Sequence, residues 1–242
     1  PVQSMRGQEM DALDYAADGL RLDRWFGILD VETQKMVGSA GGKRNWRALV
    51  TWDAQLVTPL DATEPKVEIR FPEGGSLVSD DLEIDRKRSE RLERAVEFRG
   101  AGGARAPKRY ELAPCHLLTS ATLRRLNRSY PEGEFAPERF RPNVLLDCGD
   151  EVGFIEPPWL GKEIAMSSGA VLEGTEDCQR CALTTRAQGG LPSDPKILHT
   201  VMLENNTNAG IYARVAKPGR FALGDTAQIG QGRLAASAQA SA

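Results

Sequence analysis

The stretches RFRPNVLL (residues 139–146) and DCQRCALTT (residues 177–185) organise this chain. The first carries two guanidinium groups and an amide at the head of an apolar run that predicts a buried strand at 144–146. The second carries two thiols with an arginine between them, then two hydroxyls and a short strand predicted at 182–184. Guanidinium, amide and hydroxyl groups bind phosphate, and a thiolate binds a soft metal. These are the groups that an enzyme would use to hold a phosphorylated, sulfur-rich cofactor and to ligate a soft metal.

Around these stretches the chain alternates apolar and polar residues over short runs that end at glycine or proline. Residues 25–30, 47–57, 67–71, 162–166, 170–172 and 211–215 are predicted strands. Helices are predicted over 121–129, with Ser120 as the N-cap, and over 194–203. The charged run 85–94 indicates a solvated helix face. Many short strands and few helices predict a mainly β (α+β) fold made of β-barrels.

The best candidate for a domain boundary is the Gly/Ala-rich stretch at residues 100–107. The predicted domains are residues 1–100 and 105–229. Residues 230–242 are small and polar, and we expect them to form a disordered tail.

Composition excludes several classes of protein. The chain has 242 residues, 40% of them hydrophobic and 27% charged, with a net charge of -3, so overall electrostatics do not favour nucleic-acid binding. Basic residues outnumber acidic ones between Asp85 and Arg141, which leaves a local basic surface open. No apolar run is long enough to span a membrane. Four cysteines and no visible leader fit a reducing cytoplasm.

The Cys178/Cys181 pair allows several interpretations. A structural zinc site needs four ligands, and no second pair at a suitable spacing is present. A redox dithiol would open a helix, whereas apolar and β-branched residues follow here. Two buried thiols that pack as small hydrophobic groups remain an alternative. Arg180 would favour a thiolate at Cys181 if it points there.

Other candidate groups also have plain structural readings. Arg139 and Arg141 would share one face of an extended segment, or pair with nearby carboxylates at the surface. His116 and His199 are expected to be structural. Trp159 either stacks on a flat substrate or is buried. The glycine-rich loop at 38–43 lacks the spacing of a nucleotide phosphate loop.

Five motifs in order resemble the MOSC family, the molybdenum cofactor sulfurase C-terminal domain, in the two-part form with an N-terminal MOSC-type β-barrel. They are PVQSMRG (1–7), GLRLDR (19–24), RFRPN (139–143), CQRC with TT (178–185), and PGRFALGD (218–225). This architecture is that of the mitochondrial amidoxime-reducing component and its bacterial relatives. The resemblance implies an N-terminal barrel subdomain packed on a MOSC barrel with a few short helices.

The resemblance implies a molybdenum cofactor, a pterin that carries a phosphate and a dithiolene. Cys181 would be the catalytic residue and the ligand to molybdenum, in agreement with the preference of soft metals for thiolate. Cys178 would be structural or support the site. The cofactor would be held by Gln3, Ser4, Arg24, Thr119, Ser120, Arg141, Asn143, Arg180 and Thr184. Thr119 and Ser120 would act at a helix N-terminus, where anions bind well.

One position departs from the family pattern. Gln3 stands where the family usually has lysine, which removes one cation near the cofactor. The chain also lacks a plant-type cysteine cluster for an iron–sulfur centre, so electrons would come from a separate electron-donor protein. The loops at 149–161 and 188–194 would shape the substrate pocket.

Three functions follow from these observations. The first is a molybdenum-dependent oxidoreductase that reduces an N-hydroxylated or N-oxide small molecule. The second is a molybdenum-free sulfur-transfer or carbon–sulfur enzyme in which Cys181 is a persulfide carrier or a nucleophile, a reading that Gln3 favours. The third is a non-catalytic cofactor-binding module that docks through the basic segment between Asp85 and Arg141.

Overall fold

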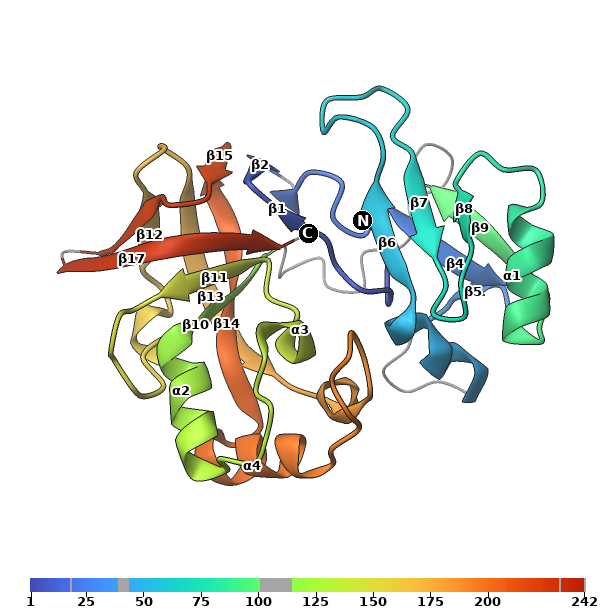
Figure 1. Cartoon of the computed structure of the whole chain (residues 1–242). Coiled ribbons are helices and arrows are strands. Elements are labelled where there is room, and N and C mark those ends of the chain that lie inside the picture. Colours follow the sequence, from blue (N-terminus) through green and yellow to red (C-terminus); the bar gives the residue numbers. More distant parts are fainter. Residues whose placement is uncertain (18, 39–43, 101–114, 231, 242) are drawn as a thin grey trace. The chain divides into compact units, whose positions relative to one another are not determined.

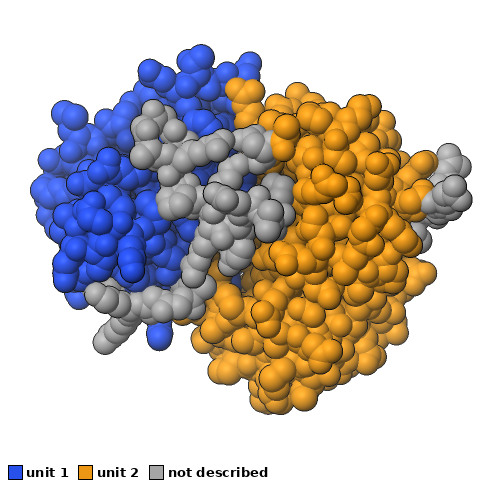
Figure 2. Space-filling view, turned by 180° about the vertical axis from the view of Figure 1, so that it is seen from behind, with its two compact units in different colours: residues 1–8, 22–109, 188–190 blue, residues 9–21, 110–187, 191–242 orange. Residues whose placement is uncertain are grey.

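A computed structural model describes residues 1–17, 19–38, 44–100, 115–230 and 232–241 (Figure 1). The chain forms two compact units, coloured blue and orange in Figure 2. The first comprises residues 1–8, 22–109 and 188–190, and the second comprises residues 9–21, 110–187 and 191–242. The predicted linker falls largely at 101–114, outside the described residues. Residues 9–21 belong to the second unit rather than to the predicted first domain, because their strands pair with strands near the C-terminus.

The second unit is built around a sheet of eight strands in the order β1-β17-β11-β10-β14-β13-β12-β16. Strand β16 also pairs with β17, so the sheet returns on itself as a barrel-like ring. The prediction of a mainly β fold with a barrel and a few short helices is confirmed. The strands are β1 (Glu9–Met10), β10 (Cys115–Thr119), β11 (Val144–Asp147), β12 (Glu163–Met166), β13 (Val171–Gln179), β14 (Asn208–Lys217), β16 (Thr226–Ile229) and β17 (Gly232–Ser241).

Strand β17 occupies most of the segment for which the sequence predicts a disordered tail. It pairs antiparallel with β1, β11 and β16. Small residues are weak strand formers by themselves. The strand depends instead on backbone pairing with β1, β11 and β16, which the composition of the segment does not show.

Buried apolar side chains from the strands form one cluster, the barrel cluster, which fills the interior of the second unit. Strands β2 (Ala12–Ala16), β3 (Gly19–Leu20) and β15 (Gly219–Ala222) form a small sheet whose Leu13, Tyr15 and Phe221 join the same cluster. The rings of Tyr15 and Phe221 lie 4.6 Å apart, centroid to centroid. Their contact ties residues 9–21 to the C-terminal strands.

Strands β10 and β11 run parallel, and the connection between them contains α2 (Ser120–Ser129) and α3 (Pro137–Phe140). These helices and α4 (Lys196–Asn205) share a second apolar cluster with Leu118 of β10. Figure 1 shows α2 and α4 close to one another beside the strands. Thr119, and not the predicted Ser120, is the N-cap of α2: its side chain accepts a hydrogen bond from the amide of Thr122.

The short helix η2 (Pro157–Trp159) ends at Trp159, which is buried in the barrel cluster. Of the two readings of this side chain, the structural one is therefore confirmed.

The first unit contains two three-stranded sheets. One is formed by β4 (Phe26–Asp30), β5 (Lys35–Met36) and β9 (Val96–Gly100), the other by β6 (Asp53–Leu56), β7 (Val67–Arg70) and β8 (Ser76–Val78). The strand predicted at 47–57 is correct only at β6, because the 3-10 helix η1 (Arg44–Thr51) precedes it. A separate apolar cluster fills this unit.

Helix α1 (Ile84–Leu92) lies in the charged segment predicted as a solvated helix face. Most of its charged residues are exposed or partly exposed, but Arg88 is fully buried. Its guanidinium carbon lies 3.9 Å from the centre of the Phe98 ring. Within the described ranges no helix is long and apolar enough to cross a membrane.

Candidate cofactor site around Cys181

Cys181 follows the end of β13 and caps the 3-10 helix η3 (Ala182–Thr185), and its side chain is exposed. The strand predicted at 182–184 is wrong. The backbone amide and the hydroxyl of Thr184 both donate to the Cys181 carbonyl, at 3.2 and 3.0 Å. These two hydrogen bonds to one carbonyl turn the chain back after Cys181. The β-branched residues of this segment favour a strand, so the sequence alone does not reveal the turn.

Cys178 has the opposite setting, fully buried within β13. The Nη1 atom of Arg180 donates to its Sγ atom at 2.6 Å. Burial raises the pKa of the Cys178 thiol, but the charges of His116 and Arg180 and hydrogen bonds from His116 and Tyr212 outweigh burial and lower it to about 6. Cys178 is therefore largely a thiolate at neutral pH, held between cationic and hydrogen-bonding partners.

His116 reaches Cys178 because of the way β10 alternates. Cys115 and Leu117 belong to the barrel cluster, so His116 points to the opposite face. Its Nε2 lies 3.0 Å from the carbonyl oxygen of Ala209 on β14. A carbonyl can only accept, so Nε2 carries a proton. The sequence predicted a structural role for His116 and had no signal for its interaction with Cys178, which depends on the pairing of β10, β14 and β13.

The backbone of β14 is shaped to admit the imidazole. The register between β13 and β14 shifts between Asp177 and Gln179, on either side of Cys178. Gly210 has a φ of 76°, and a Cβ there would clash with the Leu117 carbonyl oxygen and lie 2.7 Å from His116 Nε2. Bulges often redirect side chains near functional sites. This one places Cys178 against the imidazole.

Arg180 is engaged on both sides of its guanidinium group. Besides the bond to Cys178, its Nη2 donates to the carbonyl of Phe140 at 2.6 Å. Its backbone amide donates to the carbonyl of Thr207 at 2.8 Å. The sequence raised the possibility that Arg180 favours a thiolate at Cys181, whereas in the structure its hydrogen bond goes to Cys178.

Arg139 is fully buried and donates to four main-chain carbonyls. Nε reaches Glu134 at 2.7 Å, and Nη2 reaches Pro192 at 2.8 Å. Nη1 reaches the carbonyls of Thr184 at 3.2 Å and Arg186 at 3.3 Å. The prediction that Arg139 shares an extended face with Arg141 is wrong, because Arg139 lies in α3. The side chain joins α3 to the loops on both sides of η3.

Arg141 and Asn143 follow α3 directly. Arg141 is the C-cap of this helix, with a φ of 55°. The Oδ1 atom of Asn143 accepts from the amide of His116 at 2.9 Å, and the amide of Asn143 donates to the carbonyl of His116 at 2.9 Å. The RFRPN segment therefore contacts the His116 strand and, through Phe140, the guanidinium of Arg180.

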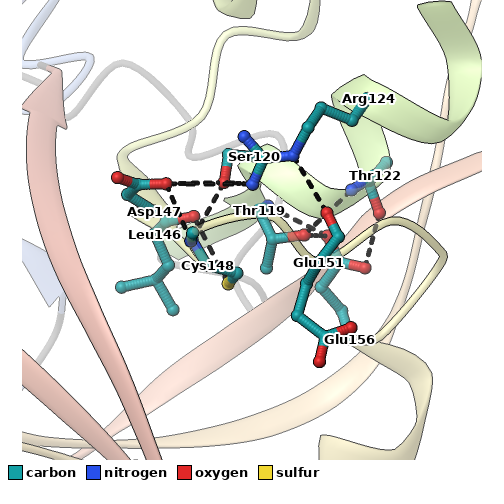
Figure 3. Close-up of polar contacts among 10 residues, drawn as sticks. Thr119, Ser120, Thr122, Arg124, Leu146, Asp147, Cys148, Glu151 and Glu156 are labelled. Atoms are coloured by element: carbon teal, nitrogen blue, oxygen red, sulfur yellow. Dashed lines mark hydrogen bonds and ion pairs between the residues drawn. The ribbon is translucent and has the colours of Figure 1, made fainter.

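Thr119 and Ser120 belong to a separate cluster of polar side chains at the start of α2, shown in Figure 3. The Oε1 atom of Glu156 accepts from the amide and the hydroxyl of Thr119, at 2.9 and 2.8 Å. Ser120 Oγ donates to Asp147 at 2.9 Å. Two protein carboxylates thus accept hydrogen bonds at the N-terminal end of α2, where the family resemblance implies donors to the cofactor.

Glu156 is the centre of this cluster and was not predicted. It is almost fully buried, and its Oε2 accepts from the hydroxyl of Thr122 at 2.7 Å. Burial raises the pKa of the Glu156 carboxyl against the lowering effect of these bonds. The only signal in the sequence is a carboxylate before two prolines, which has no specific meaning.

Near this cluster, Arg128, Cys148, Asp150, Glu151 and Val152 line a concavity of about 560 Å³. Burial raises the pKa of the Cys148 thiol to about 11, so this thiol is neutral at physiological pH. None of the predicted site residues lines this concavity.

Three further predicted residues lie in the first unit. The amide of Gln3 donates to the carbonyl of Phe26 at 2.8 Å. Arg24 forms an ion pair with Asp23, with Nη2 and Oδ2 2.5 Å apart. Ser4 and Arg24 have φ values of 71° and 49°. Non-glycine residues rarely adopt positive φ, and such residues concentrate at functional sites. Arg141 shares this property, so three of the predicted cofactor residues have an unusual backbone.

In the described part of the chain, no three His, Cys, Asp or Glu side chains gather around a common point. The thiol of Cys181 is exposed at the surface.

Comparison with known proteins identifies the family of one part of the chain. The family model described as the MOSC domain matches residues 109–228. A solved structure titled as the YuaD protein from Bacillus subtilis is similar over 99% of this chain and 94% of that chain, with a TM-score of 0.46 and 11% sequence identity. A search of curated proteins finds no significant match. Residues 109–228, which contain RFRPN, CQRC and the helices beside them, are therefore a MOSC domain.

Proposed function

We propose that this protein binds a molybdenum cofactor, with Cys181 as the thiolate ligand of molybdenum, and reduces an N-hydroxylated or N-oxide compound. The observation that carries the proposal is the contrast between the two thiols of CQRC. Cys178 is buried and bonded to Arg180, while Cys181 is exposed at the end of a strand. Only Cys181 is accessible to a metal.

The donor set fits the cofactor. A soft thiolate suits molybdenum, and arginine and amide groups suit a pterin phosphate. In the second unit the proposed holding residues are Arg141, Asn143 and Arg180. Gln3, Ser4 and Arg24, in the first unit, stay predictions from the family resemblance. Thr119 and Ser120 are weaker candidates, because an anion there would have to displace their bonds to Glu156 and Asp147. When bound, the cofactor supplies two-electron redox chemistry.

The chain's own residues have defined tasks in this proposal. The Cys178 thiolate and the Phe140 carbonyl hold the guanidinium of Arg180 immediately before the metal ligand. Asn143 holds the strand that carries His116, whose imidazole supports that thiolate. Electrons would come from a separate donor protein.

The experiment is molybdenum and pterin analysis of protein from a cofactor-producing host, with wild type, Cys181→Ser and Cys148→Ser compared. We expect about one molybdenum per chain in wild type and in Cys148→Ser, and loss in Cys181→Ser with unchanged folding. Reduction of an amidoxime or N-oxide with a chemical electron donor should follow the molybdenum content. Equal molybdenum content in wild type and Cys181→Ser would remove Cys181 as the ligand.

A molybdenum-free sulfur-transfer enzyme is the second candidate, supported by Gln3 in place of lysine and by the accessible Cys181 thiol. Folded wild-type protein without molybdenum, but with cyanide-labile sulfur on Cys181, would favour it.

The non-catalytic docking module has less support. Five arginines of the basic segment pair with carboxylates: Arg86 with Glu83 and Glu90, Arg91 with Glu73, Arg94 with Asp30 and Glu32, Arg99 with Glu97, and Arg125 with Glu204. These pairs neutralise part of the charge on which a basic docking face would depend.

A further inference from the structure

The residues that follow Cys181 form a hydrogen-bonded unit around its peptide group. Thr184 is fully buried, although the family resemblance assigns its hydroxyl to the cofactor. That hydroxyl is 3.0 Å from the carbonyl oxygen of Cys181, and the Thr184 amide is 3.2 Å from the same atom. Both donors of Thr184 are therefore directed at the peptide group of Cys181.

A second layer holds Thr184 itself. The Nη1 atom of Arg139 donates to the carbonyls of Thr184 and Arg186, so it spans the end of η3. Its Nη2 and Nε bind the carbonyls of Pro192 and Glu134. A guanidinium group presents its donors in a rigid plane, so one side chain fixes several segments at once. Arg139 is fully buried, which leaves its donors no water to exchange with.

We propose that Thr184 and Arg139 are positioning residues that hold the backbone of Cys181, and through it the direction of its exposed thiol. The hydrogen bonds run in series, from Arg139 to the Thr184 carbonyl and from the Thr184 hydroxyl to the Cys181 carbonyl. Thr184 then acts on the cofactor only through Cys181. The consequence for molybdenum rests on the proposed function, but the effect on the backbone and thiol of Cys181 does not.

A matched pair of variants separates the hydroxyl from side-chain packing. Thr184→Val keeps the shape of the side chain and removes the hydroxyl, whereas Thr184→Ser keeps the hydroxyl and removes a methyl group. Losing one hydrogen bond should shift the local opening equilibrium about threefold to tenfold. We expect amide exchange over residues 182–186 to accelerate by that factor in Thr184→Val and to stay within about twofold of wild type in Thr184→Ser.

Two further readouts report on the thiol rather than on the fold. Alkylation of Cys181 by iodoacetamide, quantified by mass spectrometry, should change at least about threefold in rate in Thr184→Val and recover in Thr184→Ser. In protein loaded with molybdenum, the electron paramagnetic resonance spectrum of Mo(V) should shift in Thr184→Val alone. Arg139→Lys, with one donor nitrogen in place of three, should resemble Thr184→Val if it folds.

The outcomes distinguish this inference from the proposed function. If wild type contains no molybdenum, but Thr184→Val still accelerates exchange and alters alkylation, the positioning role stands and the molybdenum proposal fails. If Thr184→Val and Thr184→Ser match wild type in exchange and alkylation, the positioning role is overturned, whatever the molybdenum content.

Discussion

The Nη1 atom of Arg180 lies 2.6 Å from the Sγ atom of Cys178, in the interior of the second unit. The charges of Arg180 and His116 make this buried thiol more acidic despite the opposing effect of burial. The two cysteines of CQRC thus differ in setting: Cys178 is buried and bonded to Arg180, and Cys181 is exposed.

This relationship predicts a pH dependence of stability. The pKa of Cys178 falls from 9.0 to about 6 on folding. The thiolate therefore adds to the free energy of unfolding in full above pH 9, and this stabilisation is lost as the pH falls towards 6. Relative to Cys178→Ser, the free energy of unfolding of wild type should fall by about 2 to 4 kcal/mol between pH 8.5 and pH 6. Urea denaturation at a series of pH values measures this.

Cys148→Ser is the control, because the Cys148 thiol stays neutral in the folded protein over this range. It should keep the slope of wild type. Parallel stability curves for wild type and Cys178→Ser would show that Cys178 is not an anion.

Replacement of the two fully buried arginines, Arg139 and Arg88, should have different effects on the free energy of unfolding. Arg139 has four carbonyl partners, so Arg139→Met should cost about 3 kcal/mol or more. Among the described residues, no hydrogen-bond acceptor reaches the guanidinium of Arg88, and burial lowers its pKa to about 9. Replacement of a buried charge by an apolar group is often neutral or stabilising, so Arg88→Met should change stability by about 0 to +2 kcal/mol.

Thermal and chemical denaturation of both variants test this contrast. Strong destabilisation by Arg88→Met would mean that its contact with the Phe98 ring outweighs the cost of burying the charge.

Gly210 should be intolerant of a side chain. With a φ of 76° and no space for a Cβ beside Leu117 and His116, Gly210→Ala should cost about 3 kcal/mol or more and displace the imidazole. Gly161 has a similar φ of 73° but no atom within 4 Å of a Cβ, so Gly161→Ala should cost only about 1 kcal/mol. Equal losses in the two variants would show that backbone conformation, and not the approach of His116, sets the requirement.

Glu156 should make stability depend on pH in the opposite direction to Cys178. Its pKa is raised on folding, so the folded state holds the proton more tightly and stability declines as the pH rises from 4.5 through the folded pKa. Glu156→Gln should remove this decline. Glu156→Ala should cost about 3 kcal/mol, because it leaves the donors of Thr119 and Thr122 without an acceptor.

Denaturation of the three proteins between pH 4.5 and pH 8 measures this. A steeper decline in Glu156→Gln than in wild type would contradict the assignment.

The sequence by itself determined the strands with strong alternation, such as β7, and the helix that follows the TS pair at 119–120. Alternation and capping act over a few residues, so they can be read from a short window. The motifs RFRPN and CQRC also predicted the MOSC domain, since the order of such motifs along the chain is a property of sequence.

Tertiary structure decided which of these residues interact. His116 is on β10, whereas Cys178 is on β13, with β14 between these strands. Arg139 reaches carbonyls at 134, 184, 186 and 192. The structure has η3 in place of the strand predicted at 182–184, because Thr184 donates two hydrogen bonds to the Cys181 carbonyl. Glu156 finds its partners, Thr119 and Thr122, at the start of α2, far from it in the sequence. Such groups gain stability only when chain segments far apart in sequence meet and water is excluded, a condition that local composition does not encode.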